Sequence, residues 1–105
     1  MRILKVSPGA ILEIKEIEDN LRACQDEVGG LIDIVEITDS IDLYVNDEFL
    51  LNGSDPSLFL NDNLIVHGDC FFKSEHFEQD INYIYKKLRK IKVNGEWILV
   101  WIQNI

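Results

Sequence analysis

Basic residues are missing from the middle of this chain. No lysine or arginine occurs between Ala23 and Phe72, and the 105 residues carry 10 basic against 19 acidic side chains, a formal net charge of −9. A nucleic-acid backbone is bound by clustered lysines and arginines that displace counterions from its phosphates. The charge balance therefore argues against direct nucleic-acid binding and against an anionic membrane surface. It favours a basic protein surface as the partner.

Cysteine and histidine are also scarce, and their spacing excludes the usual metal sites. The four candidate ligands are Cys24, His67, Cys70 and His76, and the sequence has neither a Cys-x-x-Cys nor a paired-histidine motif. We therefore expect no bound metal and no cofactor. Cys24 lies on an apolar helical face and Cys70 in an apolar strand, so we expect both thiols to be buried, unreactive and not joined in a disulfide.

The sequence lacks long apolar runs and catalytic motifs as well. No run approaches the length of a membrane span, and the opening residues MRILKVSPGA lack the apolar region of a signal peptide. We therefore expect a single domain, 1–105, in the cytoplasm of a bacterial host cell. Adjacent carboxylates such as Asp26 and Glu27 diverge on a helix or strand, so they form no general acid–base pair. The protein is expected to be non-enzymatic.

The apolar pattern that is present predicts an α+β fold, with a largely antiparallel sheet of five or six strands and two helices. A Pro-Gly turn separates residues 2–6 from residues 11–17, so the two segments predict a hairpin. The polar residues of the second strand do not alternate strictly, which favours an edge of the sheet for this strand. Residues 31–37 are apolar on both faces and predict a central strand. Residues 41–46 alternate, which places Ile41, Leu43 and Val45 inward and Asp42, Tyr44 and Asn46 outward.

Two segments predict helices. A short helix near 20–28 begins at a cap, Asp19 or Asn20, and ends at Gly29. A long helix near 77–92 has an apolar stripe at intervals of three and four residues and five cations near its end. Asn94-Gly95 is also a hairpin signal. We favour Gly95 as the end of the long helix, followed by a strand over 96–102.

The remaining segments have weaker patterns. Residues 47–63 look irregular, with a turn signal at Asn52-Gly53 and a helical turn that Pro56 would start. Residues 64–73 are apolar and favour a strand, but His67-Gly68-Asp69 interrupts them, which indicates a bulge, a bend or a break into two strands.

The acidic middle of the chain supplies the candidate partner-binding residues. One interpretation is a solvated surface that aids solubility. The other is a surface that covers a basic nucleic-acid-binding groove, in which Asp39 and Asp42 would share one region with Asp47 and Glu48. Under this second interpretation we infer a non-enzymatic protein that blocks such a groove on its partner. The predicted contact residues are Asp26, Glu27, Asp39, Asp42, Tyr44, Asp47, Glu48, Asp55 and Asp62.

The C-terminal segment supports an alternative function. The strand over 96–102 is apolar on both faces and contains both tryptophans. It is either a central strand covered on two sides or an edge that associates with another chain. In the second case Trp97, Leu99 and Trp101 would form a self-association surface of a structural or housekeeping module of a mobile element. The protein would then be a homodimer instead of a monomer.

Three stretches of the sequence resemble a known family. They are MRILKVSPG at the start, VGGLIDIV at residues 28–35, and GDCFF at residues 68–72. Together they are similar to short proteins of unknown function carried by bacteriophages and mobile elements of Gram-positive bacteria. The resemblance covers about the first seventy residues, and the segment 47–63 departs from the family's pattern. It implies a context in which small accessory proteins disarm bacterial defences by binding nucleases. Together with the acidic surface, the resemblance implies a non-enzymatic inhibitor of a bacterial defence nuclease, such as a CRISPR or restriction effector.

Overall fold

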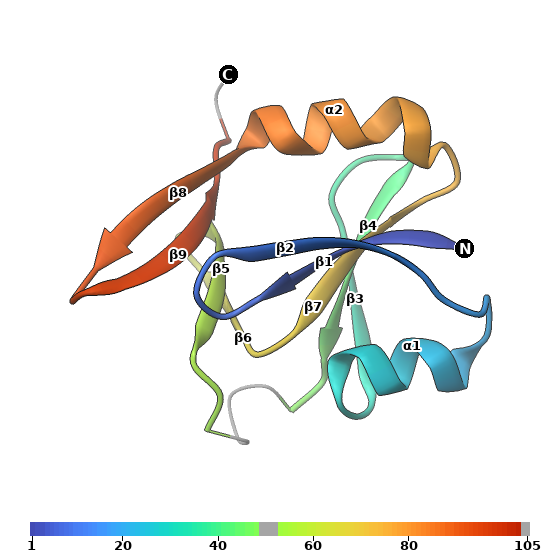
Figure 1. Ribbon diagram of the computed structural model, residues 1–105, viewed down its shortest axis with the longest axis horizontal. Helices are drawn as coiled ribbons and strands as arrows, with labels where there is room; N and C mark the ends of the chain where they lie inside the picture. The colour runs from blue at the N-terminus through green and yellow to red at the C-terminus, as the bar shows by residue number, and fades with distance from the viewer. Residues whose placement is uncertain (49–52, 104–105) are drawn as a thin grey trace.

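The protein folds into two β-sheets and two helices (Figure 1), which confirms the α+β class. The computed structural model describes residues 1–48 and 53–103. None of the helices among these residues is long and apolar enough to cross a membrane. The elements, in chain order, are β1 (Arg2–Ser7), β2 (Ile11–Glu16), α1 (Leu21–Val28), β3 (Ile32–Glu36), β4 (Ile41–Asn46), β5 (Pro56–Asn61), β6 (Leu64–His67), β7 (Cys70–Ser74), α2 (Phe77–Lys87), β8 (Leu88–Val93) and β9 (Glu96–Trp101).

Sheet A is fully antiparallel, with the strand order β2-β1-β7-β4-β3. The predicted β1–β2 hairpin is confirmed, and β2 lies at an edge as expected. The prediction that residues 31–37 form a central strand is wrong, because β3 is the opposite edge of the sheet. Both faces of β3 are apolar because Ile32 packs under α1 while Val35 packs against the core between the sheets.

Sheet B has the order β6-β5-β9-β8, and its central pair, β5 and β9, is parallel. The break at Gly68 is confirmed, since β6 and β7 belong to different sheets. The prediction of an irregular segment over 47–63 is partly wrong, because Pro56 begins the strand β5 and not a helical turn. The Ser57 hydroxyl donates a hydrogen bond to the Val66 carbonyl at 3.1 Å. Asn52, half of the predicted turn signal, lies outside the described residues.

The short helix follows its sequence signals. The Asn20 side chain accepts a hydrogen bond from the Ala23 N–H at 2.8 Å, which caps α1, and Gly29 ends it in the left-handed conformation at φ 80°. Its buried residues, Cys24 and Val28, face sheet A. The prediction of a helix near 20–28 is therefore confirmed.

The long helix is shorter than predicted. α2 ends at Lys87, and Leu88 enters β8 directly in an extended conformation, with no intervening loop. Asn94 (φ 52°) and Gly95 (φ 83°) form the turn of the β8–β9 hairpin. Hairpin turns of this kind need positive φ at both central residues, which an Asn-Gly pair tolerates. The Asn-Gly hairpin signal therefore predicted this segment correctly, and the helical apolar stripe did not. β8 is a strand because it pairs along its whole length with β9.

The main core lies between the two sheets. The residues predicted to point inward from β4 (Ile41, Leu43 and Val45) are buried there, together with Ile84 of α2. A second apolar cluster lies on the other face of sheet A beneath α1. The prediction that Asn46 faces solvent is wrong, since α1 covers that end of β4.

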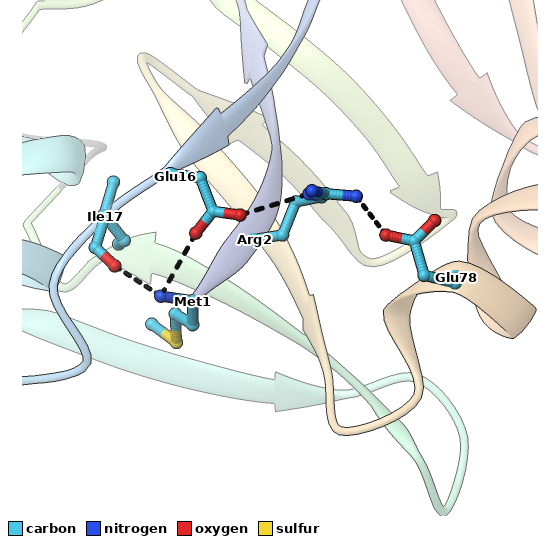
Figure 2. A network of polar contacts seen from close by, with 5 residues as sticks. All are labelled: Met1, Arg2, Glu16, Ile17 and Glu78. Carbon is cyan, nitrogen blue, oxygen red and sulfur yellow. Dashed lines mark hydrogen bonds and ion pairs between the residues drawn. The ribbon is translucent and has the colours of Figure 1, made fainter.

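The start of β1 is tied to its neighbours by polar contacts (Figure 2). The amino group of Met1 lies 3.6 Å from the Glu16 carboxylate, and Arg2 Nε lies 3.2 Å from the same side chain. The Arg2 guanidinium also pairs with Glu78 in the first turn of α2. The side chains of Arg2, Glu16 and Glu78 are exposed, so these pairs add little stability, and only the contact with Glu78 reaches α2.

Candidate functional site

Three of the predicted partner-binding carboxylates meet at one pocket, which we call the acidic pocket. Asp26 and Glu27 reach it from the last turn of α1, and Asp55 from the residues that lead into β5. Asp69, between β6 and β7, lines another part of its wall. The pocket has a volume of about 460 Å³, and the one basic side chain among its lining residues is that of His67.

Backbone contacts fasten the two loops that carry Asp55 and Asp69. The Gly68 N–H donates to the Asp55 carbonyl at 2.9 Å, and His67 Nδ1 lies 2.9 Å from the Ser54 carbonyl oxygen. Gly68 has a φ of 77°, and a Cβ at this position would lie 3.2 Å from the Ser54 side chain. A glycine is therefore required where the chain passes from sheet B to sheet A beside the pocket.

Asn46 joins the end of β4 to the end of α1. Its Nδ2 donates to the Val28 carbonyl at 3.1 Å, and its Oδ1 accepts the Glu48 N–H at 2.7 Å. A Cβ on Gly30 would lie 3.0 Å from this Nδ2, so the close approach needs glycine there. Asn46 lines the acidic pocket, and the exposed Asp47 and Glu48 follow it directly.

Beneath the pocket, two lysines are already paired with its carboxylates. Lys5 Nζ lies 2.9 Å from Glu27 Oε2 and 3.4 Å from Asp69 Oδ2, while Lys15 Nζ donates to Glu27 Oε1 at 2.8 Å. The side chains of Lys5 and Glu27 are only 16% and 13% exposed. These cations hold the wall of the pocket together and offset its two innermost negative charges.

The surroundings of Glu27 keep it ionised. Burial opposes its charge, but the hydrogen bonds from Lys15 and Lys5 outweigh burial and hold the pKa of Glu27 below its usual value. The pKa of Lys5 is raised, because burial is outweighed by its contacts with Glu27 and Asp69. A general acid at neutral pH needs a carboxyl with a raised pKa. Glu27 is therefore a fixed anion and not a proton donor.

The exposed carboxylates in and next to the pocket are less neutralised. Asp26 and Asp55 line the acidic pocket, and Asp47 and Glu48 follow its lining residue Asn46 in the chain. We call these four exposed residues the rim carboxylates. Asp26 lies 3.9 Å from Arg22 Nε in a solvated pair, and the other three have no ion pair within the described part of the chain. This arrangement can bind cationic groups through charge-assisted hydrogen bonds.

Comparison with protein families assigns the chain to one of them. A family model described as a domain of unknown function, DUF3846, matches residues 1–87. The chain belongs to this family. No curated protein and no solved structure matches it. The DUF3846 match contains the acidic pocket and ends at the last residue of α2, so the β8–β9 hairpin lies outside the matched residues.

The other predicted contact residues lie elsewhere on the DUF3846 domain. Asp39 and Asp42 are at the start of β4 and Asp47 at its end, so the expectation that they share one region is wrong. The strand rise alone separates Asp42 from Asp47 by roughly 17 Å. Asp62 lies in the turn between β5 and β6. The Tyr44 ring stacks on Phe71 under α1, which leaves it partly buried.

The C-terminal strand is the central strand that one of the two sequence interpretations described. β9 pairs with β5 on one side and β8 on the other, and its Leu99 and Trp101 are buried. These two residues are therefore unavailable for self-association, and the free-edge interpretation is wrong. Trp97 is 42% exposed, with the ammonium groups of Lys90 and Lys92 over its ring at 4.6 and 5.4 Å.

The four candidate metal ligands do not converge. Cys24 belongs to the cluster beneath α1, whereas Cys70 lies in the core between the sheets. His76 precedes α2, and His67 lines the acidic pocket. Across residues 1–48 and 53–103, no group of three or more histidine, cysteine, aspartate or glutamate side chains is placed to hold a metal ion.

Sequence reasoning missed Lys5, Lys15 and Asp69 as parts of the site. Lys5 and Lys15 lie on the face of the β1–β2 hairpin that α1 covers, which is also the face that carries Ile3. A lysine on a covered face needs a carboxylate as its partner. The two lysines were therefore the sequence signal that a carboxylate packs against this face. Its partner Glu27 lies on a helix whose docking direction the sequence does not specify.

Proposed function

We propose that this DUF3846 protein is a non-enzymatic inhibitor that binds the nucleic-acid-binding surface of a bacterial defence nuclease with its rim carboxylates. The resemblance to phage and mobile-element proteins suggests such a setting, in which the protein acts in the cytoplasm of the bacterial host. No cofactor is part of this proposal. The partner is a basic protein surface, and direct contact with nucleic acid is not required.

One observation carries the proposal: the rim carboxylates face solvent, and apart from the solvated contact of Asp26 with Arg22 they have no ion pair among the described residues. Lys5 and Lys15 are engaged below with Glu27 and Asp69, so they do not offset Asp26, Asp47, Glu48 or Asp55. Ordinary protein surfaces intersperse both signs of charge. A surface of one sign attracts a partner of the opposite sign and speeds its association.

The shape of the site supports a protein partner more than a small molecule. The pocket is polar and has room for the long side chain of a lysine or arginine. Such a side chain would meet carboxylates from the end of α1 and from the loops before β5 and β7. Nucleic-acid-binding grooves present several lysines and arginines together, and the rim carboxylates offer several anions from different elements.

The test is inhibition of cleavage by purified nucleases from the defence systems of the bacterial host. The rim variant (Asp26→Asn, Asp47→Asn, Glu48→Gln and Asp55→Asn) removes four charges and preserves shape. The control variant (Glu18→Gln, Asp19→Asn, Asp39→Asn and Asp62→Asn) removes four exposed charges elsewhere. We expect the wild type and the control variant to inhibit one of the nucleases and the rim variant to fail. Unchanged cleavage by all of them, or inhibition that the rim variant retains, would contradict the proposal.

A further inference from the structure

Two of the sheet edges carry charges of opposite sign. β8 is an edge of sheet B and holds three cations, Arg89, Lys90 and Lys92, with no carboxylate. β3 is an edge of sheet A and holds two exposed carboxylates, Asp33 and Glu36, with no cation. Within the described residues, no strand pairs with the outer side of either one. Such an edge is a template for another strand.

The backbone groups that face outward on β8 follow from its pairing with β9. The Ile102 N–H donates to the Lys87 carbonyl at 2.7 Å, so the backbone N–H and C=O groups of residue 87 point toward β9. Because antiparallel hydrogen bonds alternate, the N–H and C=O groups of Leu88, Lys90 and Lys92 point away from β9. These are free positions at which a new strand would bond.

The same reasoning applies to β3. The Ile37 N–H donates to the Ile41 carbonyl at 2.9 Å, so Ile32, Ile34 and Glu36 direct their backbone groups outward. The outward Ile34 N–H is held by the Asp33 side chain at 2.9 Å. This local bond opens when another strand pairs there.

We propose that the β3 edge of one copy of this chain pairs with the β8 edge of a second copy, so that sheet A of one continues into sheet B of the next. In the antiparallel register that places Glu36 opposite Lys90, Val35 lies opposite Ile91. The Glu36–Lys90 pair is ionic and the Val35–Ile91 pair apolar, and both kinds stabilise a sheet. The next two pairs, Ile34 with Lys92 and Asp33 with Val93, are mixed.

Charge selects this pairing over the symmetric alternatives. Two β8 edges would bring lysines and an arginine together, and two β3 edges would bring carboxylates together, which destabilises cross-strand pairs. The β2 edge mixes Lys15 with Glu13 and Glu16 and has no single sign. A contact between two different surfaces is heterologous, so it produces an open chain of copies and not a closed dimer, unless a ring closes.

Exposed apolar side chains add to this contact. Ile91 and Val93 of β8 are 42% and 49% exposed, and the register places Val35 of the added strand beside Ile91 on the same face. Ile91 and Val93 line a groove of about 450 Å³ on the outer face of sheet B, together with Phe59 and Ile65. The added strand would extend this apolar face beyond the edge of β8.

The test is the mass distribution of the full chain, measured by sedimentation at about 0.1 M salt, where surface charges act over about 10 Å. The wild type is expected to form a series of oligomers that lengthens with protein concentration. The β8 variant (Lys90→Glu, Lys92→Glu) and the β3 variant (Asp33→Lys, Glu36→Lys) should each associate at least about tenfold more weakly, because attraction becomes repulsion.

An equimolar mixture of the two variants makes the test independent of folding. In the mixture, the unchanged β3 edge of one variant meets the unchanged β8 edge of the other, and the two charge-reversed edges also carry opposite signs, so assembly should return. Arg22→Glu is the matched control, since it reverses a charge on the exposed face of α1 and should leave assembly unchanged. A wild type that stays monomeric, a dimer that does not grow, or a mixture that stays dissociated would overturn the proposal. Neither edge variant changes a rim carboxylate or the Arg22 that lies beside Asp26.

Discussion

Lys5 on β1 and Glu27 on α1 form an ion pair of 2.9 Å that is largely shielded from solvent. Lys15 meets the other oxygen of the same carboxylate, so Glu27 joins both strands of the first hairpin to the helix. Two charges removed from water are tolerated only when each finds a partner of good geometry. The position of α1, and with it that of Asp26 at the pocket, therefore depends on this carboxylate.

We expect Glu27→Gln to lower the free energy of unfolding by about 1–3 kcal/mol, because Lys5 then keeps only its longer contact of 3.4 Å with Asp69, and Lys15 loses its anion. Glu13→Gln is the matched control, since Glu13 is exposed on the same hairpin and should change stability by less than about 0.5 kcal/mol. Denaturant titration of both variants checks this. Equal stability of the two would contradict the structural role of Glu27.

The contribution of this pair should depend on pH at both ends of the scale. The pKa of Glu27 is lowered in the folded state, so its stabilisation is present above its ordinary value of 4.5 and is lost as pH falls through the folded pKa. The pKa of Lys5 is raised above 10.5, so its stabilisation is lost as pH rises through the folded pKa. The stability difference between wild type and Glu27→Gln should shrink in both directions. A difference that stays constant from pH 3 to 7 would be contrary to this account.

Asn46→Ala should destabilise the fold by about 1–3 kcal/mol, because the Val28 carbonyl at the end of α1 loses its side-chain donor. Asn61→Ala, which changes an exposed asparagine at the end of β5, is the control and should cost less. Thermal melting distinguishes the two. If Asn46→Ala melts with the wild type, the amide does not hold α1 to β4.

The two cysteines should resist thiol reagents while the protein is folded. Burial raises the pKa of the Cys70 thiol to about 12, and both cysteines are buried. Because the thiolate is the reactive form, native protein should react only as fast as it unfolds. Reaction with a colorimetric disulfide reagent should release two thiols per chain in denaturant and almost none in buffer. Rapid release of one equivalent from native protein would show that a thiol is accessible.

The turn between β8 and β9 should tolerate glycine and reject alanine. Gly95→Ala places a side chain at φ 83° and should cost about 1–2 kcal/mol. Asn94→Gly keeps positive φ accessible and should change stability by less than about 0.5 kcal/mol. Thermal melts of the two variants provide the measurement. Similar losses in both would be inconsistent with the hairpin that replaces the end of the predicted helix.

The sequence was sufficient wherever local chemistry decides the structure. The cap at Asn20, the stop at Gly29 and the Pro-Gly hairpin depend on residues close together in the chain, and all three were predicted. The end of α2 was not, because Leu88 and Ile91 continue the helical stripe and also suit a strand. Pairing with β9, which the sequence does not rank against helix formation, decided between them.

The candidate site was predicted only in part, for a related reason. Charge composition indicated the carboxylates, but their grouping depends on how β4, β5 and β7 are ordered in space. Asp26 and Asp55 are 29 positions apart in the sequence and line one pocket, whereas Asp42 and Asp47 are near in sequence and lie at opposite ends of β4. Strand order results from long-range pairing, which single residues do not encode.

The most direct test of the central claim is the affinity of the chain for a nuclease that it inhibits, measured at two salt concentrations. The wild type is compared with the rim variant and the control variant, which lose the same four charges from different places. We predict that the rim variant binds more than about tenfold more weakly and with a flatter salt dependence, while the control variant stays within about twofold of the wild type. Equal affinities of the rim and control variants at both salt concentrations would contradict the claim that the rim carboxylates bind a basic surface.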